Sequence, residues 1–284
     1  MSDSPSDAAF DAPAGAAGSV PAQTSAPTPL APITVEVEGL TKSFVEEGRG
    51  EVHAVAGIDF VCREGEVFGL LGANGAGKTT TLRMLSTVLR PTAGRARVLG
   101  HDVETDGEAV RRSLGFHSAS TALYPRLTAR ETLDFFARVN QLPPDRVERR
   151  VDELIERFGI GEYADARVEK LSSGMKQKVA IARTLAHDPP LLIFDEPTVG
   201  LDVLNAMSLL EIVEELRAEG RTVIYSSHIM SEAERLCDRI AVLHRGQILA
   251  LGTLEELQDA TGLHYLQDIF VSYVKAAESD AEAE

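Results

Sequence analysis

The chain has 284 residues, which is enough for one α/β domain of about 230 residues with tails. Its 44 acidic residues outnumber its 28 basic ones, which gives a net charge of −16 and argues against nucleic acid as the main partner. An acidic surface fits either ordinary solubility or adaptation to a salty cytoplasm. Cys62 and Cys237 lack metal-ligand spacing and fit a reduced cytosolic compartment. Because the sequence has neither an apolar run of 18 residues nor a signal-peptide pattern, we expect no membrane span and no secretion signal.

The N-terminal part changes character near residue 32. Residues 1–31 consist mostly of Ala, Pro, Ser and Asp, which cannot bury enough apolar surface to fold, so we expect a disordered tail. From Ile33 the sequence ITVEVEGL alternates apolar and polar residues, as a half-buried strand does. The polar stretch EEGRGE at 46–51 predicts a hairpin loop, and VHAVAGIDFVC at 52–62 predicts the next strands.

The stretch from Glu66 to Leu89 predicts a buried strand, a glycine-rich loop and a helix. Its sequence GANGAGKT fits the pattern G-x-x-x-x-G-K-[ST], and a chance match in this length is roughly a one per cent event. Backbone N–H groups of such a loop, together with the helix N-terminus, form an anion site. Lys78 can reach the β- and γ-phosphates of a nucleotide, and the Thr79 hydroxyl can ligate Mg²⁺. The predicted phosphate-binding residues are Gly72, Ala73, Asn74, Gly75, Ala76, Gly77, Lys78, Thr79 and Thr80.

The middle of the chain is predominantly helical. A turn and a short strand are expected at 91–100 and a further strand at 110–116, whereas residues 124–167 show helical spacing. Thr128 can cap a helix with Glu131 three residues later, which is a capping box. We therefore expect a helical subdomain at about 120–170, in which one helix has an apolar face made of Val147, Val151, Leu154, Ile155 and Phe158.

A second chemical motif follows the aliphatic strand at 191–194, which ends in Asp195 and Glu196. At the carboxyl end of a strand Asp195 lies where a Mg²⁺ partner is needed, and Glu196 can polarise an attacking water. Alone, this motif would indicate only a charged strand end before a turn. With the phosphate loop upstream, it predicts the second half of a P-loop ATPase.

The remaining segments alternate between strands and helices, which predicts a parallel core sheet. The turn LSSGMKQK at 171–178 opens a helix, where Ser172 is either a simple N-cap or part of an anion site. Residues 254–275 predict two helices broken at Gly262. Their apolar residues form either core or a docking face, with core the preferred interpretation: Leu266, Ile269, Phe270, Tyr273 and Val274.

The motifs together resemble those of the ATP-binding-cassette (ABC) ATPases from residue 34 to about 250, in family order: Phe44, GANGAGKT, LSSGM, LLIFDE, Gly200-Leu201-Asp202 and His228. The resemblance implies an α/β P-loop NTPase domain of the ABC type with a parallel core sheet, an antiparallel β subdomain and a helical subdomain. We place this domain at 32–252, a C-terminal helical extension at 253–275 and an acidic tail at 276–284. The implied cofactors are ATP and Mg²⁺.

The same resemblance implies roles for single residues. Phe44 would stack on adenine, Asp202 would cross a dimer interface, and His228 would sense the γ-phosphate. Without the family resemblance, Phe44 would be interpreted as a core residue and His228 as a histidine with a structural role only. Lys78, Glu196 and His228 are the implied catalytic residues, and Thr79 and Asp195 the implied metal ligands. The turn LSSGM resembles the signature turn of the family, which would contact the γ-phosphate held by a second subunit. This contact implies a head-to-tail homodimer. The signature residues that would bind the nucleotide are Ser172, Ser173, Gly174 and Met175.

The chain departs from the family pattern at several positions. Ser173 and Met175 replace a glycine and a glutamine of the signature. Ala119 stands where most members carry a glutamine that touches Mg²⁺ or water, so water, Ser118 or Ser120 would have to act there. This pattern, with STALYPRLTARETL after it, resembles the sodium-export (NatA-type) branch of the ABC-2 exporter ATPases.

That branch implies an ATPase subunit on the inner face of the cell membrane, bound to an integral-membrane ABC-2-type permease and powering export, with sodium as the candidate solute. One alternative is a multidrug or lipid exporter. A distant alternative is a soluble ABC ATPase acting on nucleic acid or the ribosome, against which the single cassette and the acidic surface argue. A subunit that only senses ATP is disfavoured by Lys78, Asp195, Glu196 and His228.

Overall fold

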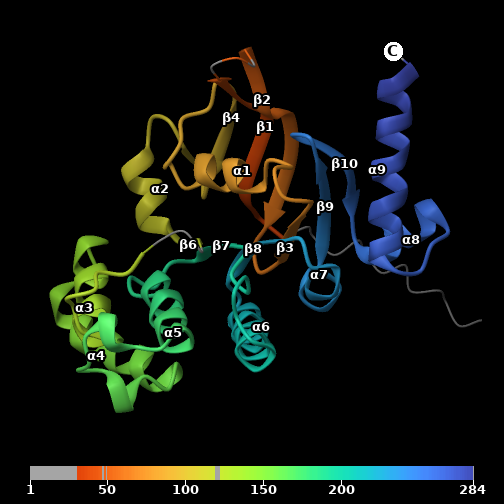
Figure 1. Ribbon diagram of the computed structural model, residues 1–284. Coiled ribbons are helices and arrows are strands. Elements are labelled where there is room, and N and C mark those ends of the chain that lie inside the picture. The colour runs from red at the N-terminus through yellow and green to blue at the C-terminus, as the bar shows by residue number, and fades with distance from the viewer. Residues whose placement is uncertain (1–30, 47, 49, 119–121, 284) are drawn as a thin grey trace, which may run out of the picture. The chain divides into compact units, whose positions relative to one another are not determined.

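The computed structural model of the protein describes residues 31–46, 48, 50–118 and 122–283 (Figure 1). Residues 1–30 of the expected tail lie outside this part, as do Ala119, which stands in place of the family's glutamine, and Ser120, one of the groups expected to act instead of it. Within the described residues the strands form a four-stranded sheet of order β2-β1-β4-β5 and a six-stranded sheet of order β10-β9-β3-β8-β7-β6.

The four-stranded sheet is antiparallel throughout and forms the expected β subdomain. Its long hairpin closes where the polar stretch at 46–51 predicts it, with Glu46 paired to Gly50. Its apolar side chains are buried against α1 and the second sheet, as for Val37 and Phe60. The strands are β1 (Ile33–Glu46), β2 (Gly50–Arg63), β4 (Ala93–Val98) and β5 (His101–Asp102).

The six-stranded sheet contains the predicted parallel core. Its strands pair in parallel from β9 to β6, and β10 returns antiparallel to β9. Every residue of β3, β7 and β8 is buried, as expected for strands covered on both faces. The strands are β3 (Val67–Leu71), β6 (Leu114–Ser118), β7 (Leu191–Asp195), β8 (Thr222–Ser227), β9 (Arg239–His244) and β10 (Gln247–Gly252).

The helices cover both faces of this sheet or extend from its ends (Figure 1). Within the described residues, none is long and apolar enough to cross a membrane. They are α1 (Lys78–Leu85), α2 (Gly107–Ser113), α3 (Ala129–Val139), α4 (Pro144–Arg157), α5 (Ser173–Thr184), α6 (Val203–Ala218), α7 (Met230–Leu236), α8 (Leu254–Thr261) and α9 (Leu266–Ala283), with short 3₁₀ turns at Gly161–Tyr163 and Val168–Lys170.

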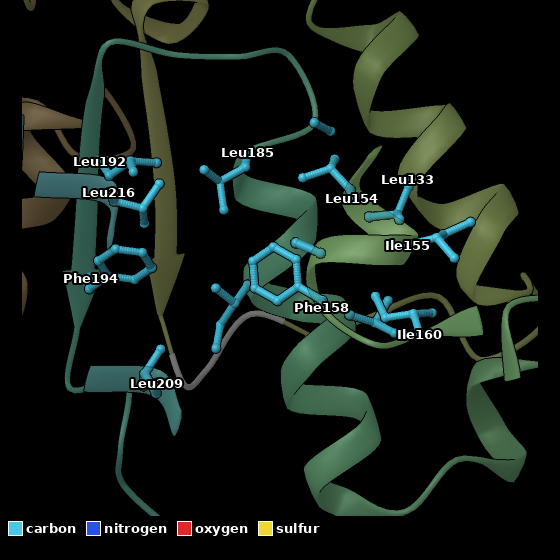
Figure 2. Close-up of a cluster of buried hydrophobic side chains, with 14 of the residues drawn as sticks. Leu133, Leu154, Ile155, Phe158, Ile160, Leu185, Leu192, Phe194, Leu209 and Leu216 are labelled. Atoms are coloured by element: carbon cyan, nitrogen blue, oxygen red, sulfur yellow. The ribbon is translucent and has the colours of Figure 1, made fainter. Parts of the chain in front are cut away.

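Successive side chains of β7 enter different cores because strand side chains alternate between faces. Leu191 and Ile193 pack toward α1 and the antiparallel sheet. Leu192 and Phe194 join the cluster built by α3 to α6, where Figure 2 shows them on the sheet side, across from Leu185 and Phe158. The helical subdomain and the sheet therefore share one core, and Asp195, next in the alternation, lies on the face of α1.

The helical subdomain matches its sequence signals. Both hydrogen bonds of the capping box are present, with Glu131 N donating to Thr128 Oγ1 at 3.0 Å and Thr128 N to Glu131 Oε2 at 2.8 Å. The predicted apolar face of α4 and the residue after it is buried throughout: Val147, Val151, Leu154, Ile155 and Phe158.

Three expectations about elements were wrong. Residues 52–62, expected to form a pair of strands, lie within the single strand β2. Residues 110–113, expected in a strand, belong to helix α2, and the strand begins only at Leu114. Val110 is the one buried residue of α2, which is only about two turns long. A single buried position shows no periodicity, so the sequence pattern does not distinguish this short helix from a strand. Helix α9 runs to Ala283 rather than ending near Lys275, because its last residues are mainly alanine and glutamate, which are strong helix formers.

The C-terminal helices break at Gly262 as expected, where φ is +70°. Leu266 and Ile269 of α9 are fully buried against residues of α7, α8 and β9, with Phe270 and Tyr273 packed beside them. The interpretation of this apolar stripe as core is therefore confirmed for its inner residues.

Candidate functional site

The phosphate loop connects β3 to α1 at the carboxyl edge of the core sheet. Gly75 and Gly77 have φ of +81° and +110°, which glycine adopts without strain. A Cβ on Gly72 would lie 2.4 Å from the Leu243 carbonyl oxygen, and one on Gly77 would lie 2.5 Å from that of Ala54. These glycines are therefore required by the close packing of the loop against β9 and β2 as well as by its curvature.

Lys78 is buried within the loop that precedes it. Its Nζ donates to the carbonyl oxygens of Gly72 at 2.6 Å and Ala73 at 3.1 Å. The same ammonium lies 3.0 Å from Glu196 Oε1, so it connects the loop to the end of β7. A buried cation at the N-terminus of α1 provides the positive charge that a phosphate group needs.

Asp195 is the last residue of β7 and is 3% exposed. Thr79 Oγ1 donates to Asp195 Oδ1 at 3.1 Å, so the hydroxyl and carboxylate predicted to hold a metal are brought together. Both are hard oxygen donors, which is the chemistry that Mg²⁺ prefers, and one carboxylate leaves room for the waters and phosphates that this ion retains. The residues therefore fit a magnesium ion.

Glu196 has a left-handed backbone with φ of +48°, which is unfavourable for a residue with a side chain. Its N–H donates to the carbonyl oxygen of Ser226 at 3.2 Å and to Ser226 Oγ at 3.1 Å, and these contacts hold the turn. His228 Nδ1 lies 3.4 Å from Glu196 Oε2. Lys78, Glu196 and His228 thus form a continuous chain of charged and titratable groups.

A pocket of about 320 Å³ opens beside Lys78 and Glu196. It combines loop backbone with polar side chains, a composition suited to a polyphosphate. Its lining consists of Ala54, Asn74, Gly75, Gly77, Lys78, Thr79, Thr80 and Glu196. Ala54 on β2 was not expected from the sequence, and nothing in the local pattern indicates it, because the contact depends on how the hairpin packs on the loop.

Other predicted site residues lie away from this pocket. Phe44, on β1, is 39% exposed, and its ring lies 5.3 Å from the Lys42 ammonium. The signature turn lies against the start of α6, where a Cβ on Gly174 would approach Asn205 Nδ2 to 3.1 Å. Neither Phe44 nor the signature residues are among the residues that line the pocket.

The signature turn and Asp202 form one neighbourhood through Asn205. Ser172 Oγ accepts from Met175 N at 3.3 Å, so Ser172 is an N-cap of α5. Asp202 caps α6 by accepting from the backbone N–H groups of Leu204 and Asn205, and from Asn205 Nδ2 at 2.5 Å. These hydrogen bonds, those from Asn205 first, hold the pKa of Asp202 below its ordinary value.

Sequence reasoning did not identify Ser226 or Gln177 as parts of the site. Ser226 Oγ donates to Asp195 Oδ1 at 2.9 Å. Gln177 of α5 donates from Nε2 to the Pro197 carbonyl oxygen at 2.7 Å and lies 3.2 Å from His117 Nε2. The signal for Ser226 was its place at the end of the strand TVIYSS, since carboxyl ends of parallel strands meet at one edge.

Comparisons with known proteins agree with this geometry. The family described as ABC transporter matches residues 55–199. The ABC transporter ATP-binding protein NatA of Bacillus subtilis (strain 168) is 41% identical over 222 residues, covering 78% of this chain and 90% of that protein. The daunorubicin/doxorubicin resistance ATP-binding protein of Streptomyces peucetius is 38% identical, covering 88% of this chain and 73% of that protein.

Solved structures give the same result at the level of the fold. An ATP-binding subunit of an ABC transporter superposes with a TM-score of 0.77 at 32% identity, covering 85% of this chain and 99% of its own. A dimeric ATP-binding cassette bound to ADP and Pi superposes with a TM-score of 0.70 at 26% identity, covering 77% and 98%. The chain therefore belongs to the ABC transporter family and is one of its ATP-hydrolysing subunits.

Proposed function

We propose that this chain powers export through a separate integral-membrane permease of the ABC-2 type, as a homodimer that closes on ATP. The observation that carries the proposal is the division of the site. The phosphate loop, Asp195 and Glu196 form one half, while the signature turn and Asp202 lie together elsewhere on the same chain. Two copies in head-to-tail arrangement would bring the second half of one chain onto the first half of its partner.

The residues of the first half have distinct proposed roles. Thr79 and Asp195 would hold Mg²⁺, which neutralises phosphate charge when bound. Lys78 would contact the β- and γ-phosphates. Glu196 would orient and polarise the attacking water, and His228, which lies 3.4 Å from it, would position this carboxylate and the transferred phosphate.

The surface around Asp202 supports a second copy as its partner. Val203, Leu204 and Met207 at the start of α6 are 74%, 77% and 45% exposed, and Val199 before them is 46% exposed. Contiguous exposed apolar side chains on a soluble surface indicate an interaction site. In the proposed dimer these residues would be covered by the partner's phosphate-loop face, together with Ser172 to Met175.

A hollow of about 310 Å³ at the junction of the helical subdomain and β6 is our candidate docking site for the permease. It is lined by Tyr124, Phe136 and Arg183, among others. Tyr124 is 52% exposed, and its ring contacts Phe135, which is 41% exposed, in an edge-on arrangement. Exposed aromatic side chains around a hollow are typical of anchoring sites in protein interfaces, so a short cytoplasmic segment of the permease would insert here.

Sodium is our first candidate solute, because the chain resembles NatA-type subunits and is 41% identical to NatA of Bacillus subtilis. A drug or lipid exporter is the alternative. It is favoured by relatives named for linearmycin resistance, daunorubicin/doxorubicin resistance and Nod factor export, at 38 to 40% identity. The transported solute contacts the permease, so identity of the ATPase subunit alone does not separate these candidates.

The test is transport in inside-out vesicles that contain the chain together with a candidate ABC-2-type permease from the same cells. On addition of ATP we expect sodium to move into the vesicles, which corresponds to export from a cell, and we expect the Glu196→Gln variant to abolish this movement. Daunorubicin, followed by its fluorescence, replaces sodium in a parallel assay. Drug uptake without sodium uptake would support the alternative, and uptake of neither, with intact ATPase activity, would contradict export of both solutes.

A further inference from the structure

The carboxyl edge of the core sheet carries polar side chains on three neighbouring strands. Ser118 of β6 pairs in register with Asp195 of β7, and Asp195 pairs with Ser226 of β8. Residues paired across parallel strands point to the same face of the sheet, so these side chains form a row. Thr79 of α1 lies over the row and donates to Asp195, which places the row on the face that holds the phosphate loop.

The two oxygens of Asp195 have different partners. Oδ1 accepts from Thr79 Oγ1 at 3.1 Å and from Ser226 Oγ at 2.9 Å. Oδ2 accepts from Ser118 Oγ at 3.3 Å. Ser226 also accepts the N–H of Glu196, so its hydroxyl is bound into the turn after β7, whereas Ser118 reaches the carboxylate from the opposite neighbouring strand.

We propose that Ser118 is a positioning residue for the divalent cation of the nucleotide site, an inference that rests on the proposed function. Its hydroxyl fixes the plane of the Asp195 carboxylate, which then presents an oxygen to the metal or to a water bound to it. Mg²⁺ keeps several waters and tolerates little deviation from octahedral geometry, so the orientation of a single carboxylate matters. Hydrogen-bond partners of ligating groups are worth about 10- to 100-fold in metal affinity.

Burial makes this hydrogen bond effective. Ser118 is 5% exposed and Asp195 is 3% exposed, so bulk water does not compete for either group. Ser118 was one of the groups expected to act in place of the amide that is absent at position 119, and its hydrogen bond to Asp195 shows through which group it would act. Ser118 acts through Asp195 from the end of β6, the strand that leads into that position.

The purified full-length chain tests this proposal with Mn²⁺ as the probe and ADP as the nucleotide. Free Mn²⁺ is followed by electron paramagnetic resonance during titration into the ADP complex, and ADP affinity without metal is measured in EDTA. The variants are Ser118→Ala, Ser118→Cys, which has the same shape, is slightly larger and donates weakly, and Ser118→Thr, which keeps a hydroxyl. Ser86→Ala is the matched control, because Ser86 is equally buried but its Oγ donates to Leu82 O of its own helix at 2.8 Å.

We expect Ser118→Ala and Ser118→Cys to weaken Mn²⁺ binding in the ADP complex by about 10-fold or more while leaving metal-free ADP binding unchanged. Ser118→Thr and Ser86→Ala should stay within about twofold of wild type. Wild-type Mn²⁺ affinity in either the Ala or the Cys variant, whichever folds, would overturn the proposal. If the wild-type chain bound no ADP in either condition, the proposed nucleotide site itself would be wrong, which is a separate result.

Discussion

Glu196 illustrates how the site uses an unfavourable backbone. A residue with a Cβ at φ of +48° costs on the order of 1 kcal/mol or more, and the turn persists because Ser226 accepts its N–H twice. Its carboxylate is thereby held between the Lys78 ammonium and His228. The strain thus serves to direct one carboxylate toward the phosphate pocket, while Asp195 one residue earlier points to the Thr79 hydroxyl.

His117 on β6 predicts a pH dependence of stability. Burial first, and then the nearby charge of Arg183, lowers its pKa from 6.5 to about 4. Between these values the unfolded chain binds a proton that the folded chain does not, so the free energy of unfolding falls as pH decreases from about 6.5 to about 4. The upper bound of this loss is roughly 3 kcal/mol.

The measurement is urea unfolding across that pH range, for wild type and for His117→Gln, which removes the titrating group and keeps an acceptor for Gln177. Carboxylates and the remaining histidines titrate in both proteins, so the difference between the two curves isolates His117. Parallel curves would show that His117 does not titrate as described.

At the scale of elements, short-range signals predicted much of the fold. The phosphate loop between β3 and α1, the capping box at Thr128 and the apolar face of α4 are confirmed, because each depends on residues within a few positions of one another. Helix α2 was missed because its single buried residue, Val110, leaves no periodicity to detect. The extent of α9 was underestimated because acidic composition suggested a tail where helix propensity was high.

Helix α4 joins the helical subdomain to the sheet through a shared core, and Leu154 tests that connection. Leu154 is 1% exposed and belongs to the same cluster as Phe194 of β7 (Figure 2). Leu154→Ala removes buried apolar atoms and leaves a cavity, so we expect the free energy of unfolding to fall by about 2–5 kcal/mol. Urea denaturation followed by circular dichroism measures this loss.

The matched control is Glu148→Ala on the exposed side of the same helix, which should change stability by no more than about 0.5 kcal/mol. We expect one cooperative transition in all three proteins, because the core is continuous between helices and sheet. Two separate transitions in Leu154→Ala would show that the helical subdomain unfolds independently, contrary to a shared core.

In the molecule as a whole, the sequence motifs predicted only some of the contacts between residues that are far apart in the chain. Lys78, Thr79, Asp195, Glu196 and His228 come together as the family resemblance implied. The row made by Ser118, Asp195 and Ser226 could not be read from the sequence, because it depends on the register between strands far apart in the chain. The contact of Gln177 with Pro197 and His117 likewise depends on how α5 packs on the sheet.

We propose that each nucleotide site is completed by a second copy of the chain. The most direct measurement is the mass of the Glu196→Gln variant in solution, determined by analytical ultracentrifugation with and without ATP and Mg²⁺, with bound nucleotide quantified in the same samples. We predict a species of twice the 30.6 kDa chain mass with ATP and Mg²⁺, and the single-chain mass without them. A variant that is saturated with ATP and still sediments as a single chain would show that a second copy does not complete the site.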